Sequence, residues 1–260
     1  MMVAGKEVTR IGLGTNRLAS TPENHAFLRE AVAAGLGLID TAHVYTGGDS
    51  ERTIGEALSP APDGLVIATK GGYAGSSSPE ALRAQIDQSL ASLRTDVIDL
   101  YYLHRVDPKV PLEESLGVIA EFQEAGRIKE IGISAVGVEQ VEAARSAAPV
   151  AAVQNHYNVT DRDSDDVVDY CEENGIVFVP YYPVKRGNPP GLAEIAERND
   201  ASPAQIKLAW LLRRSPVVLP IPGTLSIEHL RENLGALEIE LTDEEFDALG
   251  QATSERYPSG

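Results

Sequence analysis

Short runs rich in β-branched and aromatic residues alternate with amphipathic stretches along nearly the whole chain of 260 residues. Some runs, such as residues 97–103, are almost continuously apolar, which is typical of strands buried on both faces. This alternation strongly restricts the folds that the chain can adopt. The predicted strands are residues 11–15, 38–42, 65–70, 97–104, 128–134, 150–158, 176–183 and 217–223.

Signals for helix starts and helix ends fill the gaps between these runs. A Ser or Thr followed by Pro is typical of a helix N-terminus, because the hydroxyl caps the helix and Pro suits its first turn. A Gly after a helical stretch is typical of the left-handed residue that ends a helix. The start signals are Thr21-Pro22-Glu23, Ser78-Pro79-Glu80, Ser202-Pro203 and the capping-box sequence Thr242-Asp243-Glu244-Glu245, and the stop signals are Gly35, Gly126 and Gly175.

Strands that alternate with helices predict a parallel sheet with right-handed crossovers. Eight such units closed on themselves form a (β/α)8 barrel, a fold that takes about 250 residues as one unit. We therefore predict an α/β protein in which residues 1–260 form a single TIM-barrel domain. An open Rossmann sheet is the alternative, but Gly12 and Gly14 lack the third glycine of its phosphate-binding turn, and no helix follows at once.

Composition excludes several classes of function. The chain has 22 Lys and Arg against 39 Asp and Glu, a net charge of −17, so it lacks the basic surface that nucleic acids or anionic membranes require. The single cysteine, Cys171, excludes an internal disulfide framework and a multi-cysteine metal site. We see no apolar window long enough for a membrane span and no signal-peptide core. We expect a cytoplasmic protein that is monomeric or weakly homo-oligomeric.

Polar side chains follow the ends of several predicted strands. In a (β/α)8 barrel the active site lies at the carboxyl ends of the strands. A lone lysine there is usually a solvated charge, and a lone histidine is usually a hydrogen-bonded core residue. A carboxylate, a phenol, an ammonium and an imidazole on one rim together indicate a catalytic site. The residues at these ends are Asp40, Tyr45, Lys70, His104, Ser134 and Gln154.

These residues lie in segments that resemble the aldo-keto reductases, in the bacterial type with a short C-terminal loop. The resemblance extends over nearly the whole chain, and the segments occur in the family's order. It implies a barrel that reduces an aldehyde or ketone with NAD(P)H. The segments are Arg10-Ile11-Gly12-Leu13-Gly14-Thr15, Leu38-Ile39-Asp40-Thr41-Ala42, Ala68-Thr69-Lys70, Tyr102-Leu103-His104-Arg105, Gly132-Ile133-Ser134, Val153-Gln154-Asn155, Pro180-Tyr181-Tyr182-Pro183, Ile221-Pro222-Gly223-Thr224 and Glu232-Asn233.

The resemblance implies that Asp40, Tyr45, Lys70 and His104 form the catalytic tetrad. Carbonyl reduction requires a hydride on carbon and a proton on the developing alkoxide. Tyr45 is the expected acid, and the Lys70 ammonium is expected to lower the pKa of a phenol, which is ordinarily near 10. Asp40 would hold Lys70 charged, and His104 would hydrogen-bond the carbonyl oxygen. The nicotinamide would supply the hydride, so no metal is expected.

The resemblance also implies where the cofactor binds. Ser134 and Gln154 match residues that hold the nicotinamide carboxamide, although Ala135 stands where Asn is frequent. Tyr181 matches the ring on which the nicotinamide stacks, and residues 223–226 precede a helix N-terminus suited to phosphate. The expected set is Gly14, Thr15, Asp40, Ser134, Gln154, Tyr181, Gly223, Thr224, Ser226, His229 and, at the adenine, Glu232 and Asn233.

The choice between NADP and NAD depends on a few positions. Many family members carry a Lys and an Arg that bind the 2′-phosphate, but Gly223 and His229 stand there in this chain. The hydroxyls of Thr224 and Ser226, the helix N-terminus and an imidazole remain. We expect NADP(H), with NAD as the alternative, and a modest preference that weakens as the pH rises through about 7. Glu228 would oppose the phosphate, and a solvent-facing His229 would contribute nothing.

The substrate side is less defined. Asn16 stands where some relatives have a Trp, and the sequence ends soon after Gln251, so we expect an open, permissive site. Lys185 and Arg186 are either solvated loop cations or contacts to the cofactor pyrophosphate.

Two alternatives to a general carbonyl reductase stay open. One is a specialised pyridoxal-type reductase, in which Asn16, His43, Arg105 and Tyr182 at the rim would recognise the substrate. The other is a barrel that binds cofactor and acts as a regulatory or scaffold partner without turnover. The intact tetrad disfavours the second, because a binding module has no need of a buried lysine beside a tyrosine.

Overall fold

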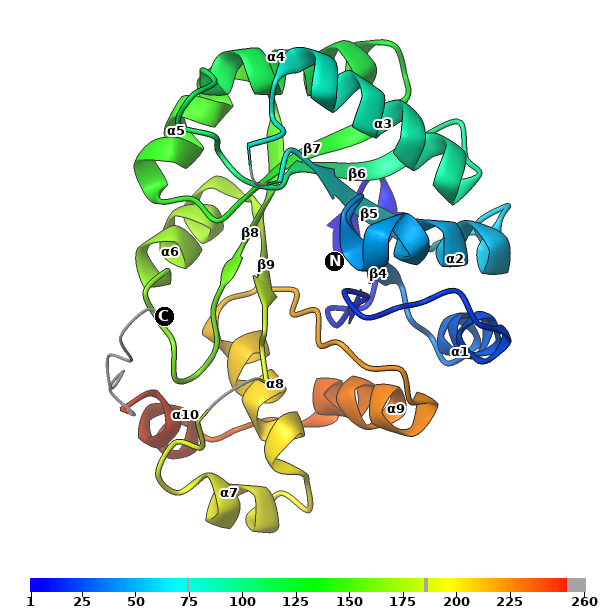
Figure 1. Ribbon diagram of the computed structural model, residues 1–260. Helices are drawn as coiled ribbons and strands as arrows, with labels where there is room; N and C mark the ends of the chain where they lie inside the picture. Colours follow the sequence, from blue (N-terminus) through cyan, green and yellow to red (C-terminus); the bar gives the residue numbers. More distant parts are fainter. Residues whose placement is uncertain (74, 185–186, 252–260) are drawn as a thin grey trace.

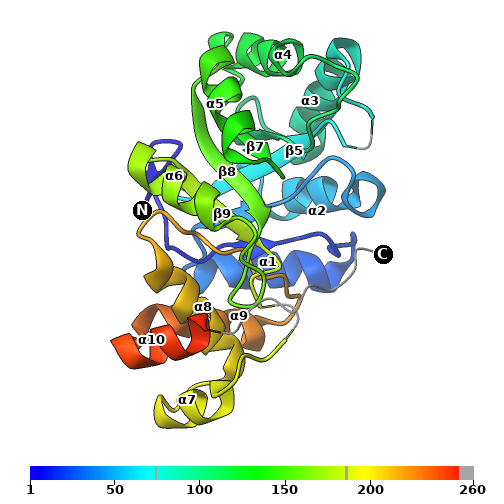
Figure 2. The same ribbon diagram turned by 90° about the vertical axis from the view of Figure 1, so that its left-hand side faces the viewer.

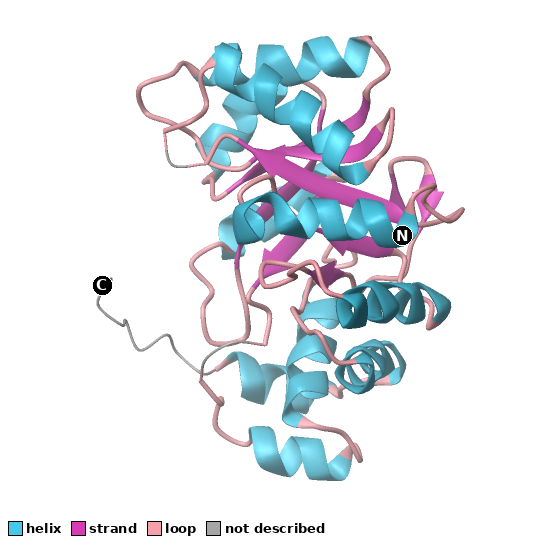
Figure 3. Ribbon diagram, turned by 45° about the vertical axis from the view of Figure 1, so that its right-hand side comes forward, coloured by secondary structure: helices cyan, strands magenta, loops and turns pink. Residues whose placement is uncertain are grey.

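The computed structural model describes residues 1–73, 75–184 and 187–251. Within these residues, seven parallel strands form one sheet in chain order, and the sheet curves into a nearly closed barrel surrounded by helices (Figure 1). Figure 3 shows helices around the outside of the strands, so apolar side chains are buried against the helices on the outer face of the sheet and inside the barrel on its inner face. The strands are β3 (Leu13–Gly14), β4 (Leu38–Asp40), β5 (Val66–Gly71), β6 (Ile98–Leu103), β7 (Ile128–Ser134), β8 (Val150–His156) and β9 (Val177–Tyr181).

The helices begin where the sequence predicts. Thr21, Ser78 and Ser202 each accept a hydrogen bond from a backbone N–H in the first turn of the helix that follows. Thr242 and Glu245 form a capping box on the last helix, and the three glycines expected after helices all have positive φ. The helices are α1 (Pro22–Ala33), α2 (Asp49–Leu58), α3 (Pro79–Leu93), α4 (Leu112–Glu124), α5 (Val138–Ala147), α6 (Asp165–Asn174), α7 (Leu192–Arg198), α8 (Pro203–Arg214), α9 (Ile227–Gly235) and α10 (Asp243–Gly250), with the 3-10 turns η1 (Tyr45–Gly48) and η2 (Ala236–Glu238).

The eighth predicted strand, residues 217–223, differs from expectation. It is an extended segment, seen in orange between α8 and α9 in Figure 1, and not a regular strand. Its Leu219 N–H donates to the carbonyl oxygen of Phe178 on β9 at 2.9 Å, and its Pro220 carbonyl accepts from the Gly12 N–H at 2.9 Å. The two prolines of this segment have no N–H to donate, so a full ladder cannot form. The (β/α)8 barrel is confirmed, and the prediction of a regular eighth strand is wrong.

A short antiparallel hairpin precedes the barrel, formed by β1 (Met2–Val3) and β2 (Lys6–Glu7). The strand pattern does not predict it, because each strand has only two residues. Val3 packs in one buried cluster with Val66 and Leu100 from the barrel strands. The hairpin therefore covers the end of the barrel opposite the carboxyl ends of the strands.

Two further helices flank the ring. Both α7 and α10 pack against α8, and Figure 2 shows the three helices together at the lower end of the molecule. Trp210 of α8 stacks on Phe246 of α10 with ring centroids 5.4 Å apart, so Trp210 is a packing residue outside the barrel. Among the residues that the structure describes, no helix combines the length and the apolar character that a membrane crossing needs.

Two glycines within helices differ in the space around them. A Cβ added at Gly55 on α2 would lie 2.2 Å from the carbonyl oxygen of Ser92 on α3, whereas one at Gly117 on α4 would meet no atom within 4 Å. We expect Gly55→Ala to lower the free energy of unfolding by about 1–3 kcal/mol, because α2 must move away from α3. Gly117→Ala should raise it by about 1 kcal/mol, since Ala favours the helix. Urea unfolding measures both, and equal stability of the two variants would contradict the expectation.

Candidate active site

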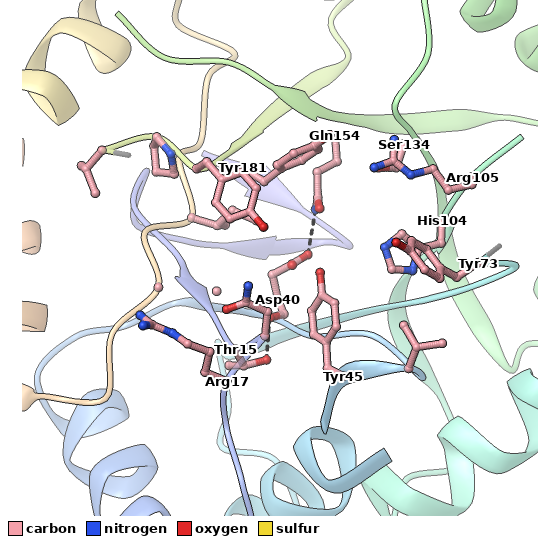
Figure 4. Close-up of a pocket in the computed structure, with 18 residues that line it drawn as sticks. Thr15, Arg17, Asp40, Tyr45, Tyr73, His104, Arg105, Ser134, Gln154 and Tyr181 are labelled. Atoms are coloured by element: carbon pink, nitrogen blue, oxygen red, sulfur yellow. Dashed lines mark hydrogen bonds between the residues drawn. The ribbon is translucent and has the colours of Figure 1, made fainter. Parts of the chain in front are cut away.

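Strand ends and one turn bring the predicted catalytic side chains together. Asp40 is the last residue of β4, Lys70 lies near the end of β5, and His104 follows β6 directly. Tyr45 opens the 3-10 turn that follows β4. Because the strands are parallel, all these positions lie on one rim of the barrel. Figure 4 shows Asp40, Tyr45 and His104 around one cavity.

A buried ion pair joins β4 to β5. Lys70 Nζ lies 2.6 Å from Asp40 Oδ1, and the two side chains are 0% and 2% exposed. Lys70 also donates to the carbonyl oxygen of Thr41 at 2.6 Å, and Gln154 Nε2 donates to Asp40 Oδ2 at 2.8 Å. Burial alone lowers the pKa of Lys70, but the charges and hydrogen bonds of Asp40 and Tyr45 together outweigh burial and raise that pKa above its ordinary value. Lys70 is therefore a charged ammonium at neutral pH.

Tyr45 lies against this ammonium. Lys70 Nζ is 5.1 Å from the centroid of the Tyr45 ring. Burial raises the pKa of the Tyr45 phenol above its ordinary value, and the positive charge of Lys70 opposes part of that rise. The expected effect of Lys70 is present, since its charge lowers the pKa of Tyr45, but desolvation is the larger effect and leaves the pKa above its ordinary value. Tyr45 is a protonated phenol that can donate.

His104 is a neutral imidazole. Its ring centroid lies 4.8 Å from that of Tyr73 and 6.0 Å from that of Tyr45, with the latter ring nearly perpendicular. Burial, and then the positive charges of Lys70 and Arg105, lower the pKa of His104 to about 3. Its buried Nδ1 has no hydrogen-bond partner among the described residues. A neutral imidazole can donate a hydrogen bond to an oxygen in the cavity over the whole physiological pH range.

Two adjoining cavities extend from these residues. The first has a volume of about 750 Å³ and the second of about 600 Å³. Arg17, Val184 and Gly223 line both, so the two cavities form one groove. The groove has aromatic rings at one end and, at the other, a helix N-terminus, which favours the binding of a phosphate. Lys185 and Arg186 lie outside the described residues.

Every residue predicted to bind the cofactor lies on this groove. The first cavity is lined by Gly14, Thr15, Asp40, Ser134, Gln154, Tyr181 and Gly223, and the second by Gly223, Thr224, Ser226, His229, Glu232 and Asn233. Of the predicted catalytic residues, Asp40, Tyr45 and His104 line the first cavity, and Lys70 is buried beneath it on Asp40. The structure therefore brings all the predicted positions together, and the role of each stays a prediction.

The second cavity ends at the N-terminus of α9. Ser226 caps this helix by accepting from the His229 N–H at 3.2 Å, and its hydroxyl donates to Glu228 Oε2 at 2.7 Å. The Ser226 hydroxyl and a backbone hydrogen bond lower the pKa of Glu228 below its ordinary value. A carboxylate therefore stands at a helix end that favours anions, where it opposes the binding of a phosphate.

The turn after β7 keeps its shape without the frequent Asn side chain. Ala135 has a φ of 58°, the left-handed region that Asn adopts readily and Ala does not. Asn155 of β8 holds the turn: its Oδ1 accepts from the Val136 N–H at 3.1 Å, and its Nδ2 donates to the Val136 carbonyl at 2.7 Å. Ser134 thus keeps its position on the cavity, while Ala135 offers no side-chain hydrogen bond to a carboxamide.

Sequence reasoning missed a second buried carboxylate, Glu51 of α2, which packs against β5. Its side chain is 1% exposed, and Thr69 Oγ1 donates to its Oε1 at 2.5 Å. Its Oε2 lies 4.0 Å from His43 Nδ1 and accepts no hydrogen bond within the described part of the chain. Glu51 shares the buried face of α2 with Ile54 and Leu58, at helical spacing. That periodicity was the available signal.

Sequence reasoning also left unassigned two side chains of the first cavity. Arg17 follows β3 and Tyr73 follows β5, and both line this cavity. Their positions after strand ends were the available signal. Of the rim residues expected for a pyridoxal-type substrate, Asn16, Arg105 and Tyr182 line the cavity and His43 does not.

Within residues 1–73, 75–184 and 187–251 no group of three or more His, Cys, Asp or Glu side chains could hold a metal ion.

Comparison with known proteins places this geometry in a family. The family model described as the aldo/keto reductase family matches residues 10–191 and 188–253. An uncharacterized oxidoreductase of Schizosaccharomyces pombe is 38% identical over 94% of this chain and 86% of that protein. The pyridoxine 4-dehydrogenase of Escherichia coli is 37% identical over 94% of each chain. The chain therefore belongs to the aldo-keto reductase family, whose members use nicotinamide cofactors.

Solved structures agree with this assignment. A thermostable aldo-keto reductase in complex with the inhibitor epalrestat has a TM-score of 0.91 and 33% identity, over 97% of this chain and 98% of that one. An aldo/keto reductase from Klebsiella pneumoniae, in complex with NADP and acetate, has a TM-score of 0.86 and 29% identity, over 96% of this chain and 93% of that one. The resemblance stated from the sequence is confirmed.

Glu51 should make the stability of the protein depend on pH. Burial raises the pKa of Glu51 above its ordinary value, so its contribution is fully present below the ordinary carboxyl pKa and is lost as the pH rises through the folded pKa. Glu51→Gln keeps the shape without the charge. We expect the Tm of Glu51→Gln minus that of wild type to be roughly 2–4 °C larger at pH 8 than at pH 5. Exposed Glu30 on α1 is the control, as Glu30→Gln, and an equal difference for both variants would contradict the argument.

Proposed function

We propose that this chain reduces an aldehyde or ketone to an alcohol with NADP(H) as its cofactor. The observation that carries the proposal is the buried pair of Lys70 and Asp40 beneath Tyr45, on the floor of an open cavity. Burying two charges costs several kcal/mol per ion before their attraction repays it, and apolar residues in their place are often neutral or stabilising. A scaffold protein without turnover would not need this pair, so its presence favours catalysis.

Tyr45 is the proposed general acid. As the carbonyl oxygen gains negative charge, Tyr45 donates its proton to that oxygen, and Lys70 stabilises the phenolate that remains. Asp40 holds Lys70 charged and in place, and Gln154 fixes the other oxygen of Asp40. A bound reduced nicotinamide supplies the hydride, which the carbonyl carbon accepts. The alcohol product then carries one hydrogen from each source.

His104 is proposed to orient the carbonyl. Because its pKa is low, at about 3, the imidazole stays neutral and donates a hydrogen bond to the same oxygen that Tyr45 protonates. A neutral donor does not compete with Tyr45 for the proton. Its packing against Tyr73 and Tyr45 holds the ring in one orientation, which fixes the face of the carbonyl that meets the hydride.

Three features support NADP(H) as the preferred cofactor. The Klebsiella pneumoniae relative was solved with NADP. Thr224 and Ser226 precede the N-terminus of α9 at the end of the groove, where a phosphate is favoured. Arg17 lines both cavities and supplies a positive charge to the groove, although Gly223 and His229 replace the frequent Lys and Arg. Glu228 limits the preference, so NADP(H) should bind only moderately better than NAD(H).

A pyridoxal-type substrate is the second candidate. It is supported by the 37% identity to the pyridoxine 4-dehydrogenase of Escherichia coli and by the rim residues Asn16, Arg105 and Tyr182 on the cavity.

A cytoplasmic location, a monomeric or weakly associated state and a single domain over residues 1–260 stay predictions.

Removing the Tyr45 hydroxyl should abolish most turnover. We expect Tyr45→Phe to lower kcat by about 10²–10⁴-fold, the usual contribution of general acid catalysis, with little change in the Kd for NADPH. Tyr73→Phe is the matched control, because Tyr73 lines the same cavity and also packs on His104. Steady-state reduction of an aldehyde panel and NADPH titration measure both variants. A Tyr45→Phe protein with more than about a tenth of wild-type kcat would exclude the proposed acid.

Charges at the start of α9 should set the cofactor preference. We expect wild type to bind NADPH more tightly than NADH, and Glu228→Gln to increase that ratio roughly two- to fivefold, because the opposing carboxylate is removed. His229→Ala should decrease the ratio, because a ring N–H that can donate to the 2′-phosphate is removed. The exposed Glu240 provides the control, as Glu240→Gln. Tighter binding of NADH, or a ratio that none of these changes affects, would contradict the proposal.

A further inference from the structure

The charges on the first cavity are opposite in sign to those of the chain. The protein has a net charge of −17. Yet the charged side chains that line the first cavity are Arg17, Asp40 and Arg105, and the ammonium of Lys70 already neutralises Asp40. Among the described residues that line this cavity, two arginines therefore remain without a carboxylate to balance them. A cavity of this kind attracts anions in a protein that otherwise repels them.

Arg105 has a free guanidinium. Its carbonyl oxygen accepts a hydrogen bond from Ser77 Oγ at 3.4 Å, but its guanidinium makes no hydrogen bond or ion pair with any residue that the structure describes. Several exposed arginines elsewhere bind an acid, as Arg83 binds Glu121 and Arg127 binds Asp87. Arg105 differs from Arg29 and Arg231, which are also unpaired among the described residues, because it lines the first cavity. In a chain with such an excess of carboxylates, an unpaired arginine on a cavity wall is available for a ligand.

The two arginines lie on opposite sides of the cavity. Figure 4 shows Arg17 near Thr15 and Arg105 next to His104, with Asp40 and Tyr45 between them. Arg17 also lines the second cavity, so its charge faces the part of the groove proposed for the cofactor. Arg105 lines only the first cavity, where the carbonyl would lie. The substrate is therefore the ligand left for Arg105.

Exposed apolar side chains surround the same cavity. Val44, Tyr73 and Tyr182 line it and are 40%, 42% and 41% exposed. Such side chains cover the planar or apolar body of a ligand. His104 and Arg105 are neighbours in the chain and line the same cavity. A ligand whose carbonyl binds His104 therefore brings a substituent on its planar body near the guanidinium of Arg105.

We propose that the preferred substrates are aldehydes with a planar apolar body and an anionic group, a carboxylate or a phosphate, which Arg105 binds. This inference rests on the proposed function and names the substrate class of that site. Arg binds carboxylates and phosphates in a bidentate geometry that Lys cannot reproduce. Arg105 is thus a specificity residue, and Tyr45 and His104 act on the carbonyl of any substrate.

A pair of substrates that differ only in charge tests the inference. The full chain is assayed at saturating NADPH with 3-carboxybenzaldehyde, an anion, and methyl 3-formylbenzoate, its neutral ester. We expect kcat/KM for the anion to exceed that for the ester by about tenfold or more, mainly through KM, as for a charge-assisted hydrogen bond. The ratio should approach one in Arg105→Gln and recover only in part in Arg105→Lys. Arg29→Gln, a change of an exposed arginine on α1 outside the cavity, should leave the ratio unchanged.

Salt provides a second measurement that needs no variant. The anion-to-ester ratio of wild type should fall between about 0.02 M and 0.5 M NaCl, because salt screens a solvent-exposed charge pair. If the ester is reduced, a wild-type ratio near one overturns the inference. A ratio that neither salt nor Arg105→Gln changes overturns it as well. No turnover of either substrate, nor of a wider aldehyde panel, overturns the proposed function instead.

Discussion

The buried ion pair between Lys70 and Asp40 is the interaction on which the rest of the site depends. Neither charge is tolerable alone in the core, since an isolated buried ion is far less stable than a solvated one. Lys70 is stabilised by Asp40 and by the carbonyl of Thr41, and Asp40 by Gln154. Gln154 comes from β8, 114 residues after Asp40. The charges are therefore satisfied only when the whole sheet has curved into a barrel.

This dependence links folding to chemistry. The same burial that makes the pair costly raises the pKa of Tyr45 and lowers that of His104, so the phenol keeps its proton and the imidazole stays neutral. Both are then hydrogen-bond donors directed at one cavity. Lys70 lies where negative charge would develop on Tyr45, and it is fixed in place before any substrate arrives. An electrostatic arrangement that needs no reorganisation during the reaction is the main way in which enzymes stabilise charged transition states.

Local patterns in the sequence predict most of the barrel, and position relative to strand ends predicts most of the site. Caps such as Ser78 and Ser202 act over three residues, so a sequence shows them directly. The prediction of a regular eighth strand was wrong. The hydrogen bonds of residues 217–223 depend on two prolines in the segment and on two neighbouring parts of the sheet. The free guanidinium of Arg105 could not be predicted for a related reason, whereas helical periodicity shows that Glu51 faces the core but not which groups surround it. Whether a charged side chain is buried or paired depends on residues far away in the chain.

The division of the cavity between two arginines follows from where variation is tolerated in a barrel. The strand ends hold Asp40 and Lys70, so the residues proposed to act on the carbonyl are positioned by the buried pair. The loops after them carry no such obligation, and they can present different side chains to different ligands. Arg17, after β3, faces both cavities, whereas Arg105, after β6, faces only the one that holds Tyr45 and His104. Under the proposals above, the carbonyl chemistry depends on residues held by the buried pair, and the choice of substrate depends on Arg105, two residues beyond the end of β6.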